Sequence, residues 1–125
     1  MNYIKRFNES INDPTYEEIT RSEWDSIVEN RLLLTDTKYP EIIKKFITDN
    51  ILYNNAKFEI SQAGKRIIIT SGIFYTSKNW DLGIDVCPDE WFVIHINKHD
   101  NGYYKFYKCD QLDGLFDFLK NMVEW

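Results

Sequence analysis

The sequence has 125 residues, of which 43% are hydrophobic and 16% aromatic, so it fits one compact globular domain with a substantial core. Fifteen Lys and Arg against 20 Asp and Glu give a net charge of −5, which argues against a protein that binds phosphate backbones through clustered positive charge. Because it has no apolar run long enough to span a membrane, no secretory signal and too few cysteines for a disulfide framework, we expect a protein of a reducing cytoplasm.

The first 14 residues differ in character from the rest. A short amphipathic head is followed by a polar connector that ends at Asn12-Asp13-Pro14, the clearest boundary signal in the sequence. We therefore expect an N-terminal peptide and linker at residues 1–14 and a single α+β domain at residues 15–125. Directly after the boundary, residues 15–19 fit either a short extended segment or an early turn.

Two helices are predicted next. Residues 20–23, Thr-Arg-Ser-Glu, have the form of a capping box, which opens a helix through about Arg31. Pro40 stands near the first position of a second helix, where its missing N–H does no harm. This helix should end before Tyr53. Its apolar stripe consists of Ile42, Ile43, Phe46, Ile47 and Ile51.

The middle of the chain predicts a hairpin and then a long connection. Residues 57–62 alternate, turn at residues 63–65, and continue as residues 66–75, whose isoleucine-rich run predicts the central strand. The connection from Thr76 to Pro88 is long for a compact domain, and such loops often carry function. A divalent-ion site or an acid/base pair could use its acidic residues, but we favour a solvated acidic loop. These residues are Asp81, Asp85, Asp89 and Glu90.

The C-terminal part predicts a second hairpin and a helix. Residues 91–97 and 103–108 alternate on either side of Asn101-Gly102, a pair that accepts the positive φ angles of a tight turn. Asp110 is suited to cap the helix, and Gly114 permits a close approach to a strand. The predicted fold is α+β, with two N-terminal helices, a four-stranded mostly antiparallel sheet built of two hairpins, and a C-terminal helix packed on the sheet.

Metal and catalytic sites are not expected. Cys87, His95, His99 and Cys109 are zinc-ligand types, but the proposed hairpin places His99 and Cys109 at opposite ends, far beyond the ~2.3 Å metal–sulfur reach. We expect two free thiols, a half-exposed packing role for His95, and no cofactor. Because no nucleophile elbow or phosphate-binding glycine loop occurs, we predict that the chain is not an enzyme; catalysis by the acidic loop is the least favoured hypothesis.

One face of the C-terminal hairpin is the candidate binding surface. Trp91, Val93, Tyr103 and Tyr107 are expected to point away from the C-terminal helix. If an N-terminal helix covers this face, it is core; if the face is open, it is a protein interface. An aromatic sheet face can also stack nucleic-acid bases, but the basic surround that such binding needs is weak here.

The N-terminal residues carry a resemblance. The sequence MNYIKRFNE resembles the capsid-targeting peptides of internal head proteins of large tailed phages, which a prohead protease cuts after a Glu preceded at two positions by an apolar residue. Phe7 and Glu9, before Ser10, match this pattern and are the proposed processing site. YEEITRSEWDSIVEN and the stretch from Asp89 to Lys120 also resemble small uncharacterised phage proteins. Residues 1–9 fit an ordinary N-terminal turn as well.

The resemblance of the N-terminal residues, the acidic charge, the missing catalytic motifs and the aromatic face together favour a non-enzymatic phage accessory protein that binds a host or virion protein. It would act in the cytoplasm of the infected host cell or in the interior of the virion head. A nucleic-acid-binding module that uses the aromatic face and a small structural component of the virion are the alternatives. Nucleic acid and membrane are not the expected partners, and the oligomeric state stays open.

Overall fold

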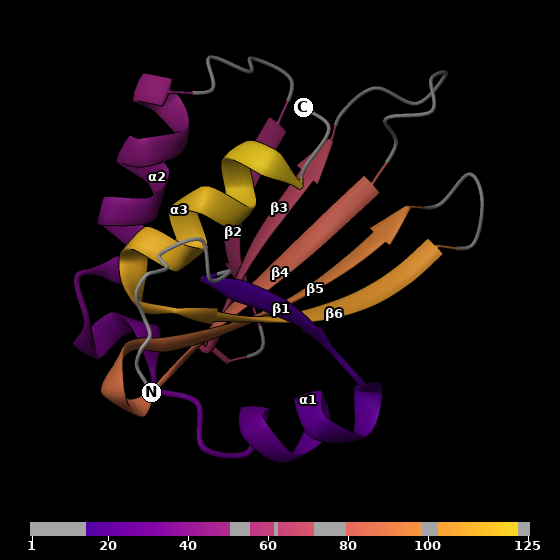
Figure 1. The fold of residues 1–125 in the computed structure, drawn as a ribbon. Helices are drawn as coiled ribbons and strands as arrows, with labels where there is room; N and C mark the ends of the chain where they lie inside the picture. Colours follow the sequence, from indigo (N-terminus) through magenta and orange to yellow (C-terminus); the bar gives the residue numbers. More distant parts are fainter. Residues whose placement is uncertain (1–14, 51–55, 62, 72–79, 99–102, 123–125) are drawn as a thin grey trace, which may run out of the picture.

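The computed structural model describes residues 15–50, 56–61, 63–71, 80–98 and 103–122. Within these ranges the chain forms three helices and six strands, which confirms the predicted α+β class (Figure 1). None of these helices is long and apolar enough to cross a membrane. In chain order the elements are β1 (Tyr16–Ile19), α1 (Arg21–Val28), α2 (Tyr39–Asn50), β2 (Ala56–Ser61), β3 (Arg66–Ser71), β4 (Trp80–Cys87), β5 (Trp91–Lys98), β6 (Tyr103–Asp110) and α3 (Gln111–Asn121).

The six strands form one antiparallel sheet in the order β1-β6-β5-β4-β3-β2. The two predicted hairpins are present as β2–β3 and β5–β6, but the predicted number of four strands is wrong. β1 decides the open question at residues 16–19 in favour of an extended segment. β4 occupies most of the stretch that the sequence predicts as a long connection, and β4 and β5 take the central place that we expected for β3.

β4 is absent from the predicted elements although its apolar residues alternate with polar and small ones, which is the period-two pattern of a strand. Leu82, Ile84 and Val86 are fully buried on one face of the sheet. Gly83 and Asp85 lie on the other face, and Asp85 is also buried, at 1% exposure. An aspartate is seldom buried unless it is paired, so the two aspartates of this stretch favour a solvated loop when only the sequence is considered.

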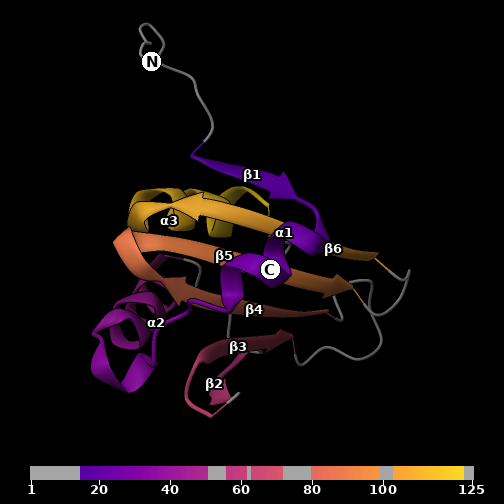
Figure 2. The same cartoon turned by 90° about the horizontal axis from the view of Figure 1, so that it is seen from below.

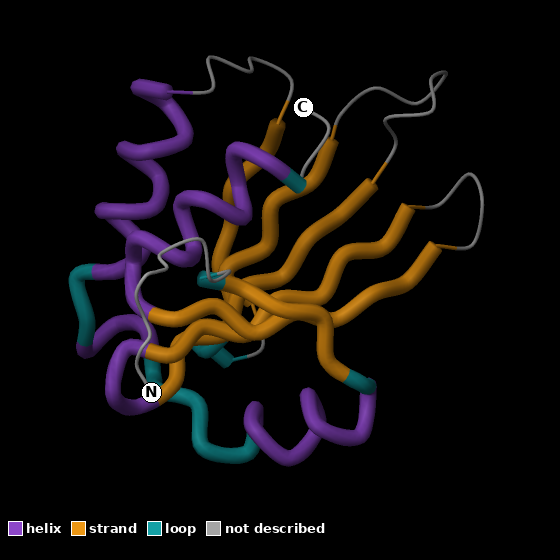
Figure 3. The backbone as a smooth tube through the Cα atoms, viewed as in Figure 1, coloured by secondary structure: helices purple, strands orange, loops and turns teal. Residues whose placement is uncertain are grey.

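The helices cover the two faces of the sheet unequally. α2 and α3 lie on one face, and α1 lies alone on the other, as Figures 2 and 3 show. We call these the two-helix face and the one-helix face.

The two-helix face holds the main core. α3 follows β6 directly and packs on the sheet, as predicted. Phe46 of α2 stacks on Phe116 of α3 with ring centroids 4.0 Å apart, which ties the two helices together. At roughly 1.5–3 kcal/mol per fully buried large side chain, this face supplies most of the hydrophobic stabilisation. Its buried residues are Leu34, Ile43, Ile47, Ile67, Ile69, Leu82, Ile84, Val86, Phe92, Ile94, Ile96, Tyr107, Cys109, Leu115, Phe118 and Leu119.

The start of α3 lies against the residue that leads into β1. A Cβ atom at Gly114 would collide with the carbonyl oxygen of Thr15, so the predicted close approach is confirmed. The same carbonyl oxygen accepts a hydrogen bond from the amide of Asp110 at 3.0 Å. Asp110 occupies the N-cap position, but its side chain makes no capping hydrogen bond, contrary to the prediction.

α1 covers part of the one-helix face. Its predicted capping box is present: the Glu23 amide donates to Thr20 Oγ1 at 3.1 Å, and the Thr20 amide donates to the Glu23 carboxylate at 3.0 Å. The helix ends at Val28, earlier than the predicted Arg31. The indole of Trp24 points into the sheet and forms the centre of a second, smaller cluster. The buried members of this cluster are Ile19, Trp24, Cys87, Val93 and Phe106.

The segment after α1 is held to β4. The amide of Leu32 donates to the Val86 carbonyl at 2.7 Å, and the amide of Leu34 donates to the Gly64 carbonyl at 2.9 Å. The pairing of β3 with β4 extends only to Ile84 of β4, so beyond Ile84 the segment after α1 bonds to β4 in place of β3. The first bond holds this segment to β4, and the second holds it to the connection between β2 and β3.

Candidate binding site around Trp91

The predicted aromatic face is divided between the two sides of the sheet. In the β5–β6 hairpin Trp91 lies opposite Asp110 and Val93 opposite Lys108, whereas Tyr107 lies opposite Ile94. Directly opposite residues share a face, so Tyr107 belongs with Ile94 on the two-helix face. The prediction that Trp91, Val93 and Tyr107 share one face is therefore wrong, because this hairpin pairs odd-numbered residues of β5 with even-numbered residues of β6.

Each of the four predicted residues has a different environment. Val93 is fully buried beneath α1, and Tyr107 is 5% exposed with its ring 4.8 Å from the Phe118 ring. Both residues belong to the core. For a hairpin face that is covered by a helix, the sequence predicted this outcome and not an open protein interface. Tyr103 lies in β6 opposite Lys98, and its side chain lies outside the described residues. Trp91 is half-buried and remains as the candidate contact residue.

Two hollows adjoin Trp91 on the one-helix face. The larger has a volume of about 370 Å³ and lies between the end of α1 and the β4–β5 turn, and the smaller, about 160 Å³, lies beside β1. Trp91 and Lys108 line both hollows and separate them. The larger hollow is otherwise lined by Ser26, Ile27, Asn30, Cys87 and Pro88. The smaller is otherwise lined by Thr15, Tyr16, Glu17 and Asp110.

Lys108 holds the indole of Trp91 in place. Its ammonium nitrogen lies 4.1 Å from the centroid of the Trp91 ring, a cation–π contact between neighbouring strands. The contact covers one side of the ring and keeps a positive charge at the rim of both hollows. The sequence prediction missed Lys108 because it assumed that odd residues of β6 share the face of Trp91.

The backbone beside Trp91 is strained. Asp89 and Glu90 in the turn between β4 and β5 both have positive φ angles, 65° and 58°. Residues other than glycine seldom adopt this conformation, aspartate less seldom than most, and such strain often marks functional segments. The turn sets the direction in which β5 begins and so determines where the Trp91 side chain lies.

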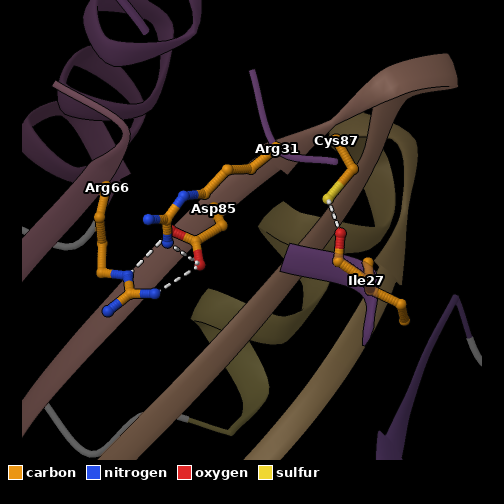
Figure 4. Close-up of polar contacts among 5 residues, drawn as sticks. All are labelled: Ile27, Arg31, Arg66, Asp85 and Cys87. Atoms are coloured by element: carbon orange, nitrogen blue, oxygen red, sulfur yellow. Dashed lines mark hydrogen bonds and ion pairs between the residues drawn. The ribbon is translucent and has the colours of Figure 1, made fainter. Parts of the chain in front are cut away.

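Buried polar contacts join the one-helix face to the segment after α1 (Figure 4). The guanidinium of Arg66 donates two hydrogen bonds of 2.9 Å to the carboxylate of Asp85, and Arg31 lies 3.7 Å from the same carboxylate. The Cys87 thiol donates to the carbonyl oxygen of Ile27 at 3.9 Å. The contact between Cys87 and Ile27 joins two residues that line the larger hollow.

The predicted acidic loop is therefore not one structure. Asp81 and Asp85 lie in β4, and Asp85 is buried and paired, so the prediction that it is solvated is wrong. Asp89 and Glu90 are exposed in the turn. The described residues contain no group of three or more His, Cys, Asp or Glu side chains that could hold a metal ion.

Both cysteines are free and buried, as predicted, but on opposite faces. Burial, together with the nearby Asp85 carboxylate, raises the pKa of the Cys87 thiol to about 11. Burial alone raises the pKa of the Cys109 thiol to about 12. Thiols with such values stay protonated near neutral pH, which makes them poor nucleophiles.

His95 lies deeper than predicted, at 8% exposure. Its imidazole packs over Gly83, where a Cβ atom would collide with the ring. It meets the Trp24 ring edge to face at 5.5 Å and stacks on Tyr104 at 5.9 Å. Burial, and secondarily the positive charge of Arg66, lowers its pKa, so the neutral form is favoured in the fold.

The proposed processing residues Phe7, Glu9 and Ser10, and with them His99, lie outside the described residues. Comparisons with protein family models, curated proteins and solved structures found no significant match for this chain.

Proposed function

We propose that this chain is a non-enzymatic phage accessory protein that binds a host or virion protein through the hollows around Trp91. The observation that carries the proposal is the half-buried indole between two adjoining hollows, in a mostly polar protein surface. Tryptophan is enriched among the residues that dominate binding energy in protein interfaces. Because the Lys108 contact and the β4–β5 turn already order the Trp91 side chain, binding costs little conformational entropy.

The two hollows differ in chemistry and so favour a partner segment of defined type. Ile27, Cys87, Pro88 and the indole give the larger hollow an apolar lining that suits one aliphatic or aromatic side chain. Glu17 and Asp110 supply carboxylates to the smaller hollow, which suits a hydrogen-bond donor such as an amide or a basic side chain. The expected partner segment carries an apolar residue close to a basic or amide-bearing one.

Two observations favour a protein partner over a nucleic acid. Tyr107 lies on the two-helix face, so the continuous aromatic surface that would stack bases is divided. The net charge of −5 also opposes binding to a phosphate backbone.

A pull-down from infected cells with two matched variants tests the proposed site. Trp91→Ala should lose the partner, whereas Tyr104→Ala, which removes an exposed aromatic on the same face but away from the hollows, should retain it. With the purified partner, Trp91→Ala should weaken binding about 30-fold, the size of a typical interface hot spot.

Circular dichroism spectra of both variants check that the fold is intact. A Lys108→Met variant removes the rim charge and the cation–π contact without truncating the indole, and it should also weaken binding because the Trp91 ring is then less ordered. Equal capture of the same partner by Trp91→Ala and Tyr104→Ala would place the interface elsewhere.

Packaging into the head is a separate part of the proposal, supported by the resemblance of residues 1–9 to capsid-targeting peptides. Mass spectrometry of purified virions should find the chain with Ser10 as its first residue. Virions that contain only the intact N-terminus would contradict processing after Glu9, and virions without this protein would contradict packaging; either result would leave the Trp91 site untouched. A fixed, high copy number in every virion would instead indicate the structural-component alternative.

A further inference from the structure

β2 forms one edge of the sheet and differs from the other edge, β1. Among the described residues β2 pairs only with β3, and it has six residues where β1 has four. An edge strand presents unpaired backbone N–H and C=O groups to any strand that can approach it. A proline in an edge strand commonly blocks such pairing, and β2 contains none.

The two-helix layer leaves the side chains of β2 only partly covered. Phe58 and Ile60 lie opposite the core residues Ile69 and Ile67, so they belong to the two-helix face. Ile60 is nevertheless 43% exposed and Phe58 is half-buried. A hollow of about 360 Å³ separates them from the start of α2, with Pro40, Glu41 and Lys44 on its far side. An apolar stripe is thus open at the edge of the sheet.

The opposite face of β2 carries one residue of each charge. Lys57 and Glu59 are both exposed and lie opposite Thr70 and Ile68 on the one-helix face. A lysine at a sheet edge normally opposes pairing, but a neighbouring strand with an acidic residue opposite it removes this obstacle. When a second copy of β2 approaches in antiparallel orientation, its Glu59 can lie opposite Lys57 of the first copy.

We propose that two copies of this chain pair through β2 in antiparallel orientation, about a two-fold axis at Phe58. This register places Phe58 opposite its own copy and places Lys57 opposite Glu59 twice, once on each side of the axis. The apolar stripes then meet on the two-helix face, and the two sheets join into one. A two-fold interface of this kind is self-complementary and closed.

Other registers are less favourable. Moving the axis to Glu59 or to Lys57 sets identical charges opposite each other, which destabilises a strand pair. Shifting one strand by a single residue places Phe58 on the same face as Glu59 of the second copy, which mixes the apolar and charged faces. Only the axis at Phe58 combines matched faces with opposite charges.

Charge reversal in two variants tests this register. Lys57→Glu sets two pairs of glutamates opposite each other in its homodimer, and Glu59→Lys sets two pairs of lysines opposite each other. Each variant alone should therefore dimerise at least about tenfold more weakly than the unmodified chain in analytical ultracentrifugation. An equimolar mixture of the two should regain the dimer, because every pair in the mixed species is again of opposite charge.

The mixture also separates a lost interface from a lost fold, since unfolded variants would not recover on mixing. Lys45→Glu is the matched control: it makes the same charge change on the solvent side of α2 and should leave the dimer unchanged. A monomer for the unmodified chain at about 100 μM, a dimer indifferent to both substitutions, or variants that fail to pair on mixing would each overturn the proposal.

Discussion

The two faces of the sheet differ in what they bury. The two-helix face is lined almost entirely by Leu, Ile, Val and Phe, many of them fully buried. The one-helix face buries an aspartate and a histidine beside its aromatic residues, and its hollows reach the surface around Trp91. The first face provides stability through apolar burial alone, whereas the second depends on specific polar partners and leaves room for a ligand.

Helix length explains this difference. α1 has eight residues and is therefore about 12 Å long at 1.5 Å per residue. Six strands about 4.8 Å apart span roughly 24 Å, so one such helix covers only part of the sheet. α2 and α3, with 12 and 11 residues, cover the opposite face together. If the two faces are stabilised in these different ways, mutations and pH should affect them differently.

Phe118→Ala should be the most destabilising change, at about 4 kcal/mol, because it opens a cavity in the closed apolar core. The side chain is fully buried between the rings of Tyr16 and Tyr107. Ile27→Ala, at the half-buried rim of the one-helix face, should cost about 1 kcal/mol. Urea unfolding measures both values, and equal losses would contradict the difference between the faces.

Asp85→Asn should cost about 3 kcal/mol, because it leaves the guanidinium groups of Arg66 and Arg31 without their buried counter-charge. The control is Asp49→Asn, which removes one partner of an exposed ion pair with Lys45 and should cost less than about 0.5 kcal/mol. Thermal unfolding at one pH compares them. A small effect at Asp85 would mean that the one-helix face does not rely on this pair.

Gly83→Ala should cost roughly 1–3 kcal/mol, because the added methyl group displaces the imidazole of His95. The cost should nearly vanish in a His95→Ala background, where the ring is absent. A double-mutant cycle measures this coupling, expected at about 1 kcal/mol or more. Gly114→Ala on α3 meets a backbone carbonyl instead, so the same His95→Ala background should not relieve its cost.

Acidification should weaken the one-helix face through His95. Because burial lowers the pKa of His95 in the fold, the unfolded chain binds its proton first as pH falls through the ordinary value of 6.5. The contribution of His95 to the free energy of unfolding is therefore constant above pH 6.5. Below pH 6.5 this contribution decreases until the pH reaches the lowered pKa of His95 in the folded form. Arg66 reinforces this direction, whereas Asp85 and Asp81 oppose it.

A His95→Gln variant should lose this part of the pH dependence. The same titration of unfolding free energy in His99→Gln separates the contribution of the other histidine. An unchanged profile in His95→Gln would show that the imidazole tolerates its charge.

The sequence predicted the elements with local signals. The capping box of Thr20 and Glu23 is present as expected, and so are the β2–β3 and β5–β6 hairpins. Hydroxyl and carboxylate caps and period-two alternation act within a few residues, so a sequence displays them directly. The alternation of β4 is equally local, but its two aspartates favour a solvated loop, and the partner that allows Asp85 to be buried, Arg66, comes from the neighbouring strand β3.

The site depended on register, which local patterns do not contain. The alternation of β5 and of β6 was recognised correctly, yet the register of their pairing decided that Trp91 shares its face with Lys108 and not with Tyr107. A change of one residue in the pairing moves every side chain to the opposite face. The hollows depend on more than the strand register, because they form only where α1, β1 and the β4–β5 turn meet beside Trp91.

Local sequence patterns established the α+β class and the helix start at Thr20, because both follow from the chemistry of neighbouring residues. Only the tertiary structure decided which face each strand residue occupies, that Asp85 is a buried ion partner, and that Trp91 stands between two hollows. These properties are set by strand pairing and by how far a short helix can cover a wide sheet, and both join residues that are remote in the chain.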